Sequence, residues 1–157
     1  MFNTINHAGF TVGSVEESLR FYRDTIGLEV EESRSGEWSG PFLTHLIGYR
    51  GTHLRIAMVR CKDGSRIQLE EFVHPELERA THEWGQPGSG HLCVEVDDIF
   101  AVWAAVRQGG YRIVSDPAEP VPLPPESVHA GGFFLGVLDP DGHVIELLQP
   151  PPHDAAE

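Results

Sequence analysis

The sequence predicts an α+β protein built from two βαβββ modules, and three observations lead to this fold class. A short motif that starts with histidine occurs twice, each copy has the pattern of a strand, and each is followed by a helix and further strands. A repeat of this kind fixes the architecture of the whole chain. We expect residues 1–74 to form the first module, 75–89 a connector, 90–150 the second module and 151–157 a disordered tail.

The repeated strands are Asn6–Val12 and Gly90–Val96, in which apolar residues alternate with other residues as in a half-buried strand. Helices are expected to start at Ser14 and Asp98, because both residue types are favoured at a helix N-cap. Ser14 also has Glu17 three residues later, which is the pattern of a capping box. Each first strand is therefore predicted to lead directly into a helix.

Three more strands are expected after each helix. An aspartate–glycine pair, which is a strong hairpin signal, separates the last two strands of each module at residues 62–64 and 139–142. The expected strands cover residues 28–32, 53–60 and 66–73 in the first module and residues 111–114, 132–138 and 143–149 in the second.

Three segments fall outside the repeat. Residues 35–51 form an insertion with a short helix expected near Thr44–Tyr49, and Pro75–Trp84 has the pattern of a helical connector. Asp116–Pro125 contains five prolines. Because proline cannot donate to a strand ladder, this last segment is predicted to be a stiff surface loop rather than a central strand.

Composition restricts the classes of partner. The formal net charge is −13, from 24 acidic and 11 basic residues, and no run of Lys or Arg occurs, so neither nucleic acid nor an anionic membrane is expected as a partner. Cys61 and Cys93 lack the short spacing of a metal site, which fits a reducing cytosol. We therefore expect a cytoplasmic protein that acts on a small molecule.

The side chains that point away from the helices provide candidate metal ligands. His7 and His91 occupy the same position in the two repeated strands, and Gln68 and Glu146 are equivalent in the two last strands. Since side chains alternate along a strand, all four are expected on the face opposite the helices. If the two sheets curl around a shared cavity, the four donors converge on one metal of a type such as zinc, iron, cobalt, nickel or manganese.

The motifs INHAGFTV, SVEESLRFYRDTIGLEV, GHLCVEVDDI and DPDGHVIELLQP resemble the vicinal oxygen chelate superfamily, which includes glyoxalase I, methylmalonyl-CoA epimerase, extradiol dioxygenases and bleomycin-resistance proteins. The resemblance runs from about Ile5 to Pro150. It implies curved mixed sheets around a shared metal-binding cavity. The ligands that it implies for one divalent metal are His7, Gln68, His91 and Glu146.

The ligand set is most similar to that of the methylmalonyl-CoA epimerases, because glyoxalase I normally has a carboxylate in the place of Gln68. The resemblance therefore implies an isomerase or lyase that abstracts a proton next to a metal-bound carbonyl of a small oxygenated substrate. Two alternatives are an extradiol Fe(II) dioxygenase, which leaves the Gln68 place unliganded, and an antibiotic-binding resistance protein. A homodimer is expected, but the sequence leaves the oligomeric state open, because paired modules can close a cavity within one chain or by exchange between two chains.

Two carboxylates are candidates for the catalytic base. Glu70 shares the face of Gln68, and Glu146 could serve if it left the metal transiently. The epimerases carry a carboxylate on the preceding strand, where this sequence places Arg55. Arginine stays protonated and cannot act as a base, so Arg55 is expected to bind a substrate carboxylate or phosphate instead. His143, in the tight turn before the last strand, is expected to be structural.

Overall fold

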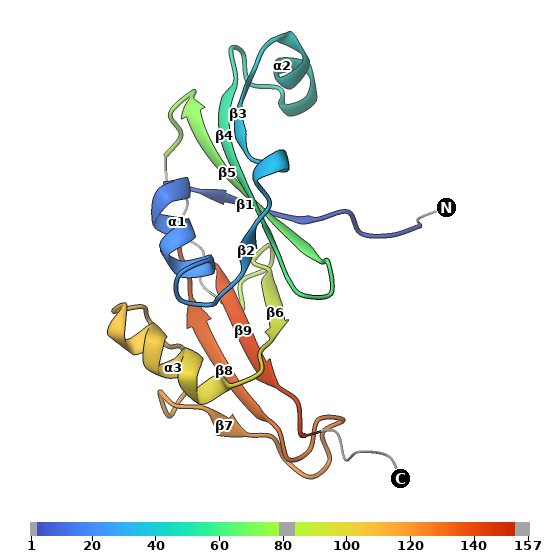
Figure 1. The fold of residues 1–157 in the computed structure, drawn as a ribbon. Coiled ribbons are helices and arrows are strands. Elements are labelled where there is room, and N and C mark those ends of the chain that lie inside the picture. Colours follow the sequence, from blue (N-terminus) through green and yellow to red (C-terminus); the bar gives the residue numbers. More distant parts are fainter. Residues whose placement is uncertain (1–2, 79–83, 153–157) are drawn as a thin grey trace. The chain divides into compact units, whose positions relative to one another are not determined.

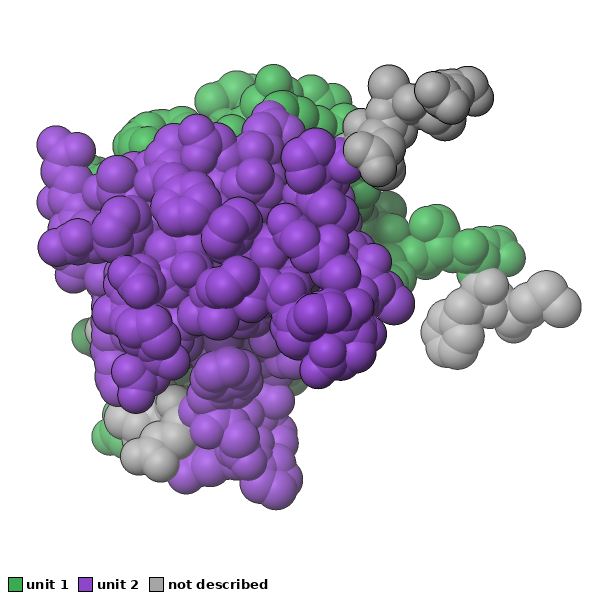
Figure 2. Space-filling view, turned by 90° about the horizontal axis from the view of Figure 1, so that it is seen from below, with its two compact units in different colours: residues 1–80 green, residues 81–157 purple. Residues whose placement is uncertain are grey.

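The computed structural model describes residues 3–78 and 84–152, and the chain divides into two compact units, residues 1–80 and 81–157 (Figures 1 and 2). Within the expected connector, the described residues 75–78 form no helix, and the following residues 79–83 lie outside the described part. Residues 153–157 of the expected tail lie outside it too. Among the described helices, none is both long and apolar enough to cross a membrane.

The first unit is a mixed five-stranded sheet that packs against one long helix (Figure 1). Strands β1 and β5 are parallel, and the other pairs are antiparallel, in the order β1-β5-β4-β2 with β3 also on β4. The elements are β1 Ala8–Val12, α1 Val15–Tyr22, β2 Glu29–Val30, the 3-10 turn Glu32–Arg34, β3 Gly36–Ser39, α2 Pro41–Ile47, β4 His53–Arg60 and β5 Arg66–His74.

The second unit is a mixed four-stranded sheet in the order β6-β9-β8-β7, with β6 and β9 parallel. Its elements are β6 His91–Glu95, α3 Ile99–Gln108, β7 Val121–Pro122, β8 Phe133–Leu138 and β9 Val144–Gln149. The predicted α+β class with two mixed sheets is confirmed. One strand was wrong, because residues 111–114 form only an isolated bridge between Ile113 and Val137. The proline-rich segment supplies β7 instead, at the sheet edge, where proline is tolerated.

The strand registers of the two units repeat each other. Gly9 pairs with Gln68 across β1 and β5, as Cys93 pairs with Glu146 across β6 and β9. In the antiparallel pairs, Gln68 lies opposite Met58 as Glu146 lies opposite a glycine of β8. Because register determines which side chains share a face, equivalent residues of the two units have equivalent orientations.

The two long helices begin in the same way. The Ser14 hydroxyl accepts a hydrogen bond from the backbone N–H of Glu17 at 3.3 Å, and the Asp98 carboxylate accepts two from the first turn of α3. Each helix is also tied to the last strand of its unit. Glu71 accepts a hydrogen bond from Val15 N–H at 2.9 Å, and the equivalent residue Gln149 accepts one from the first residue of α3 at 2.8 Å. The strand after the hairpin thus satisfies a helix donor that would otherwise lack a partner.

The insertion in the first unit holds β3 and α2. The helix starts at Pro41, where the missing N–H of proline costs nothing, and it ends at Gly48, whose φ of 87° terminates it. It therefore begins and ends a few residues before the expected Thr44–Tyr49.

Candidate functional site

The second unit brings together two of the four expected ligands. Glu146 lies on β9 between the buried residues Ile145 and Leu147, and its own side chain is 16% exposed. His91 opens the neighbouring parallel strand β6 and points to the same face, with Nε2 at 3.4 Å from Glu146 Oε2. The two side chains form a pair on the face that α3 does not cover.

The separation in this pair suits a shared metal ion. Two ligand atoms bound to one tetrahedral zinc ion at about 2.0–2.2 Å stand roughly 3.3–3.6 Å apart. The distance of 3.4 Å between His91 Nε2 and Glu146 Oε2 falls in this range. The same distance also allows an ion pair when the imidazole is protonated. Nowhere in residues 3–78 and 84–152 do three His, Cys, Asp or Glu side chains form a metal-sized cluster, so the pair in this unit offers two candidate ligands and no third of these types.

The first unit places Gln68 and Glu70 side by side. Both lie on β5. Gln68 lies between the buried residues Ile67 and Leu69, Glu70 follows Leu69, and both side chains face away from α1. The Gln68 amide nitrogen donates a hydrogen bond to the Glu70 carboxylate. That bond leaves the amide carbonyl oxygen of Gln68 as its free acceptor group, which is the atom that an amide offers to a metal.

His7 is exposed, as His91 is. It immediately precedes β1, on the same side of the sheet as Gly9, and its Nδ1 lies 2.9 Å from Asn6 Oδ1. The stacking of Phe10 against Tyr22 of α1 shows that the alternate residues of β1 face the helix. His7 therefore belongs to the Gln68 side of the sheet, as the alternation predicts.

Arg55 lies on the other face of the sheet. Its partner across β4 and β5 is Glu71, whereas Gln68 lies opposite Met58, three residues further along β4. The guanidinium bonds to Glu71 at 2.8 Å and to Glu37 at 3.1 Å. These contacts, first the hydrogen bond with Glu37 and then the charge of Glu71, raise the pKa of Arg55. The structure thus places Arg55 on the opposite face of the sheet from Gln68 and Glu70, and substrate binding by Arg55 stays a prediction of the sequence.

Glu71 is the residue that sequence reasoning missed. It links Arg55 to the start of α1, since one carboxylate oxygen bonds to the guanidinium and the other to Val15 N–H. The signal was present in the chain, because counting back from the aspartate–glycine hairpin pairs Arg55 with Glu71 rather than with Glu70.

Cys93 and His143 lie near these positions, and their contacts favour structural roles. Burial raises the pKa of the Cys93 thiol, and the charges of Glu146 and Glu95 raise it further, so the thiolate is disfavoured. His143 Nδ1 lies 2.9 Å from a carboxylate oxygen of Asp139, whose other oxygen accepts from the His143 N–H at 2.8 Å. This contact closes the turn before β9, in agreement with a structural role.

Comparison with known proteins gives the family context of these candidate residues. Residues 4–147 match the model of the Glyoxalase/Bleomycin resistance protein/Dioxygenase superfamily. The chain is 26% identical to a 2-epi-5-epi-valiolone epimerase from Actinomyces sp., covering 94% of this chain and 79% of that protein. It is 28% identical to a probable lactoylglutathione lyase from Synechocystis sp., covering 91% of this chain and 92% of that protein.

The fold has matches among solved structures as well. A glyoxalase family protein from Bacillus cereus superposes with a TM-score of 0.80 at 20% identity, covering 96% of each chain. At that identity, the likeness establishes the fold and leaves the reaction open. The family match over most of the sequence establishes more: the chain belongs to the Glyoxalase/Bleomycin resistance protein/Dioxygenase superfamily.

Proposed function

We propose that the chain is a divalent-metal-dependent isomerase or lyase that abstracts a proton next to the carbonyl of a small oxygenated substrate. The observation that carries the proposal is the His91–Glu146 pair, whose donor atoms are spaced as two ligands of one ion. The curated relatives, an epimerase and lactoylglutathione lyases, support an enzyme of this general type.

Four residues would hold the metal in this proposal: His7, Gln68, His91 and Glu146. Imidazole nitrogen, amide oxygen and carboxylate suit zinc, nickel, cobalt, manganese or iron. When bound, such an ion would act as a Lewis acid that polarises the substrate carbonyl. With only one carboxylate among the four donors, a divalent ion would keep a net positive charge.

Glu70 is the proposed base. It lies on the same face of β5 as Gln68, and the hydrogen bond from the Gln68 amide holds its carboxylate in place. A carboxylate so placed would take the proton from the carbon next to the carbonyl and return it to the same or a neighbouring carbon. Glu146 is the competing candidate for this step, but in the proposal it is a metal ligand and has His91 beside it.

Metal analysis and isotope exchange together test the proposed function. Protein purified without a histidine tag should retain about one equivalent of a divalent metal per chain. In D₂O it should then exchange deuterium into a substrate at the carbon next to the carbonyl. Lactoylglutathione and 2-epi-5-epi-valiolone are the first compounds to assay, because relatives are named for acting on them.

Other results would favour the two alternatives. Metal below roughly one-tenth of an equivalent would contradict the enzyme proposal and favour a small-molecule binding protein. Retained iron with oxygen uptake on a catechol, and no deuterium exchange, would favour an extradiol dioxygenase.

A homodimer and a cytoplasmic location remain predictions of the sequence. Light scattering of the purified chain across a range of concentrations would test the first, and fractionation of the source cells the second.

A further inference from the structure

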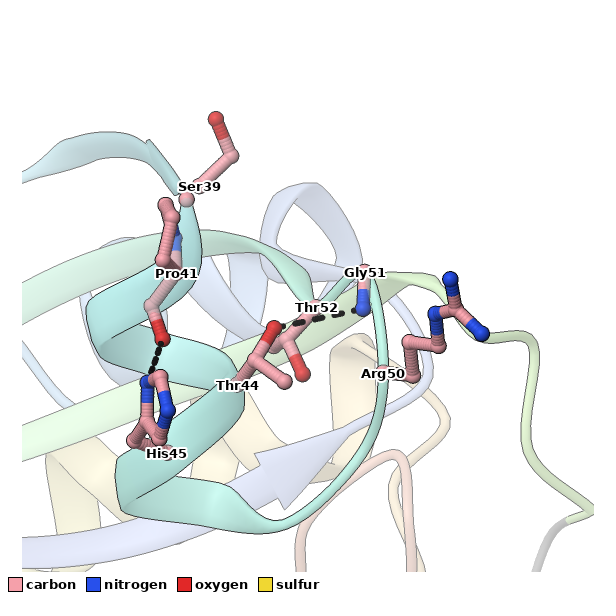
Figure 3. A pocket seen from close by; sticks show the side chains of 8 residues that line it. Ser39, Pro41, Thr44, His45, Arg50, Gly51 and Thr52 are labelled. Carbon is pink, nitrogen blue, oxygen red and sulfur yellow. Dashed lines mark hydrogen bonds between the residues drawn. The ribbon is translucent and has the colours of Figure 1, made fainter.

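The insertion between β3 and β4 contains a pocket that the proposed function does not use. It is a shallow cavity of about 430 Å³ formed by residues 39–41, 44–45 and 50–52 (Figure 3). Its volume is within the range of about 300–1,000 Å³ that small-molecule sites occupy. The pocket lies entirely in the first unit.

Hydrogen bonds within the insertion fix the wall of this pocket. Thr44 Oγ1 on α2 accepts from Gly51 N–H at 3.2 Å, so helix and loop are joined across it (Figure 3). The buried Thr52 hydroxyl donates to the carbonyl of Tyr49 at 2.6 Å. His45 Nδ1 lies 2.7 Å from the Pro41 carbonyl, which can only accept, so this nitrogen carries the proton.

Several donors remain available at the pocket. The Thr44 hydroxyl uses its oxygen as an acceptor, so its proton can be donated to a ligand. Ser39 adds a second hydroxyl, and Arg50 adds a guanidinium with five N–H donors. Figure 3 shows His45 on the helix side and Arg50 on the loop side, with Thr44 and Thr52 between them.

The charge of the pocket differs from that of the chain. The whole chain has a net charge of −13, yet none of the described residues that line the pocket is acidic. Within the described part of the chain, Arg50 also has no carboxylate partner. Many other arginines do have one: Arg20, Arg23, Arg34, Arg55, Arg60 and Arg66. An arginine with no carboxylate partner, in a pocket that also contains hydroxyl groups, is suited to an anionic oxygen ligand.

We propose that this pocket binds the phosphate or carboxylate group of a small molecule, held by Arg50 together with Ser39 and Thr44. The pocket is larger than such a group, so the group would belong to a larger ligand. The pocket is also separate from Gln68 and Glu70. Thr52 immediately precedes β4, and Met58, the residue opposite Gln68, lies within it. The separation of six residues between these positions corresponds to about 20 Å along an extended strand.

A chemical-shift titration of the full-length protein with inorganic phosphate, and separately with acetate, tests this proposal. At least one of the two ions should shift the backbone amides of Thr44, Arg50 and Gly51 along a saturable curve. Phosphate alone would assign a phosphate group and acetate alone a carboxylate, and response to both would assign a site for either. Arg50→Ala should weaken the binding by about tenfold or more, because it removes charge-assisted hydrogen bonds.

The control is Arg20→Ala, which removes an exposed arginine on α1 that pairs with Glu16. It should leave the binding constant unchanged. Ser39→Ala removes one exposed hydroxyl without charge and should weaken binding by a smaller factor, so the test does not depend on the arginine variant alone. Absence of saturable shifts with both ions would overturn the proposal. So would equal binding by Arg50→Ala and the unaltered protein, or shifts confined to amides around Gln68.

Discussion

The candidate residues of the two units share one backbone register but differ in chemistry. In residues 81–157, a histidine and a glutamate face each other, with Nε2 of His91 3.4 Å from Oε2 of Glu146. In residues 1–80, the equivalent of Glu146 is Gln68, which is neutral and donates a hydrogen bond to Glu70. Glu70 itself has an apolar equivalent, Leu148, in the second unit. Under the proposed function, this difference would divide the roles of the two units: the second would supply a charged metal ligand and the first a separate carboxylate for proton transfer.

The largest effect is expected from removing the charged ligand of the second unit. Glu146→Ala should abolish metal retention and with it the deuterium exchange. Removing a group that only orients a metal ligand lowers metal affinity by roughly 10–100-fold, so the loss of a ligand itself should be larger. Metal content after dialysis measures it. His143→Ala, in the turn before the same strand, is the control and should keep its metal. Equal loss in both variants would break the assignment of Glu146 as a ligand.

The carboxylate of the first unit should act on rate rather than on metal. Glu70→Gln is expected to retain the metal but to lower the exchange rate by about 10²–10⁴-fold, the usual contribution of a general base. Glu71→Gln changes the adjacent residue on the opposite face of β5 and should leave exchange nearly unaltered. If Glu70→Gln exchanges at the normal rate while Glu146→Gln with metal bound does not, Glu146 is the base.

The two units also differ at Glu71 and its equivalent Gln149, and the free energy of unfolding measures this smaller difference. Glu71 accepts from Val15 N–H and also pairs with Arg55, whereas the Gln149 side chain, within the described part of the chain, accepts only from the first N–H of α3. Glu71→Ala should lower the unfolding free energy by about 1–2 kcal/mol and Gln149→Ala by about 1 kcal/mol.

Glu71→Gln introduces into the first unit the residue type that the second unit has at the equivalent position, Gln149. It keeps the helix acceptor and loses only an ion pair with an arginine that is 44% exposed, so it should cost less than Glu71→Ala. Urea denaturation of the three variants measures the order. A cost for Glu71→Gln equal to that of Glu71→Ala would show that the ion pair, not the helix donor, is what Glu71 stabilises.

The smallest effect is expected from the two hairpin turns. In the first unit the turn contains Asp63 and Ser65, which bond to each other, whereas in the second Ser65 is replaced by His143. Partial burial lowers the pKa of His143, but the hydrogen bond and charge of Asp139, with the charge of Asp141, give a net rise above 6.5. The folded protein therefore holds this proton more tightly than the unfolded chain does.

The sign of the pH effect follows from that rise. The stabilisation is fully present below about pH 6.5 and is lost as the pH increases through the folded-state pKa. Unfolding free energies measured between pH 5.5 and pH 8.5, roughly, should fall across this window in the unaltered protein and be flatter in His143→Gln. A slope that persists in the variant would assign the titration to another group.

Most of the fold could be predicted from sequence because local signals agreed with each other. The aspartate–glycine hairpins and N-caps were correct, and β4 begins and ends at the expected residues His53 and Arg60. The strand expected at residues 111–114 was lost to tertiary context. Its place on β8 is shared with the proline-rich segment, where Val121 pairs with Phe134. Nothing in the local pattern of either segment indicates which of them forms the longer pairing.

The candidate site could be predicted only in part. Alternation along one strand gave the common face of Gln68 and Glu70, because a period of two needs no partner. The face of Arg55 required the register between two strands, and that depends on where the hairpin turn closes. The pocket of the insertion gave no signal in the sequence, since Ser39, Thr44 and Arg50 follow no regular spacing and line one pocket only in the folded chain.

The repeated register has a consequence for how such a protein can change over time. Gly9 pairs with Gln68 in the same register in which Cys93 pairs with Glu146. Each unit by itself therefore presents two donor positions, one near the start of its first strand and one on its last strand, on the side away from its helix. A single ancestral unit that paired with an identical copy would therefore already have offered four such positions. After duplication, mutation could alter the donors of one copy while selection kept those of the other. The difference between Gln68 and Glu146 is the kind of divergence that this inheritance permits.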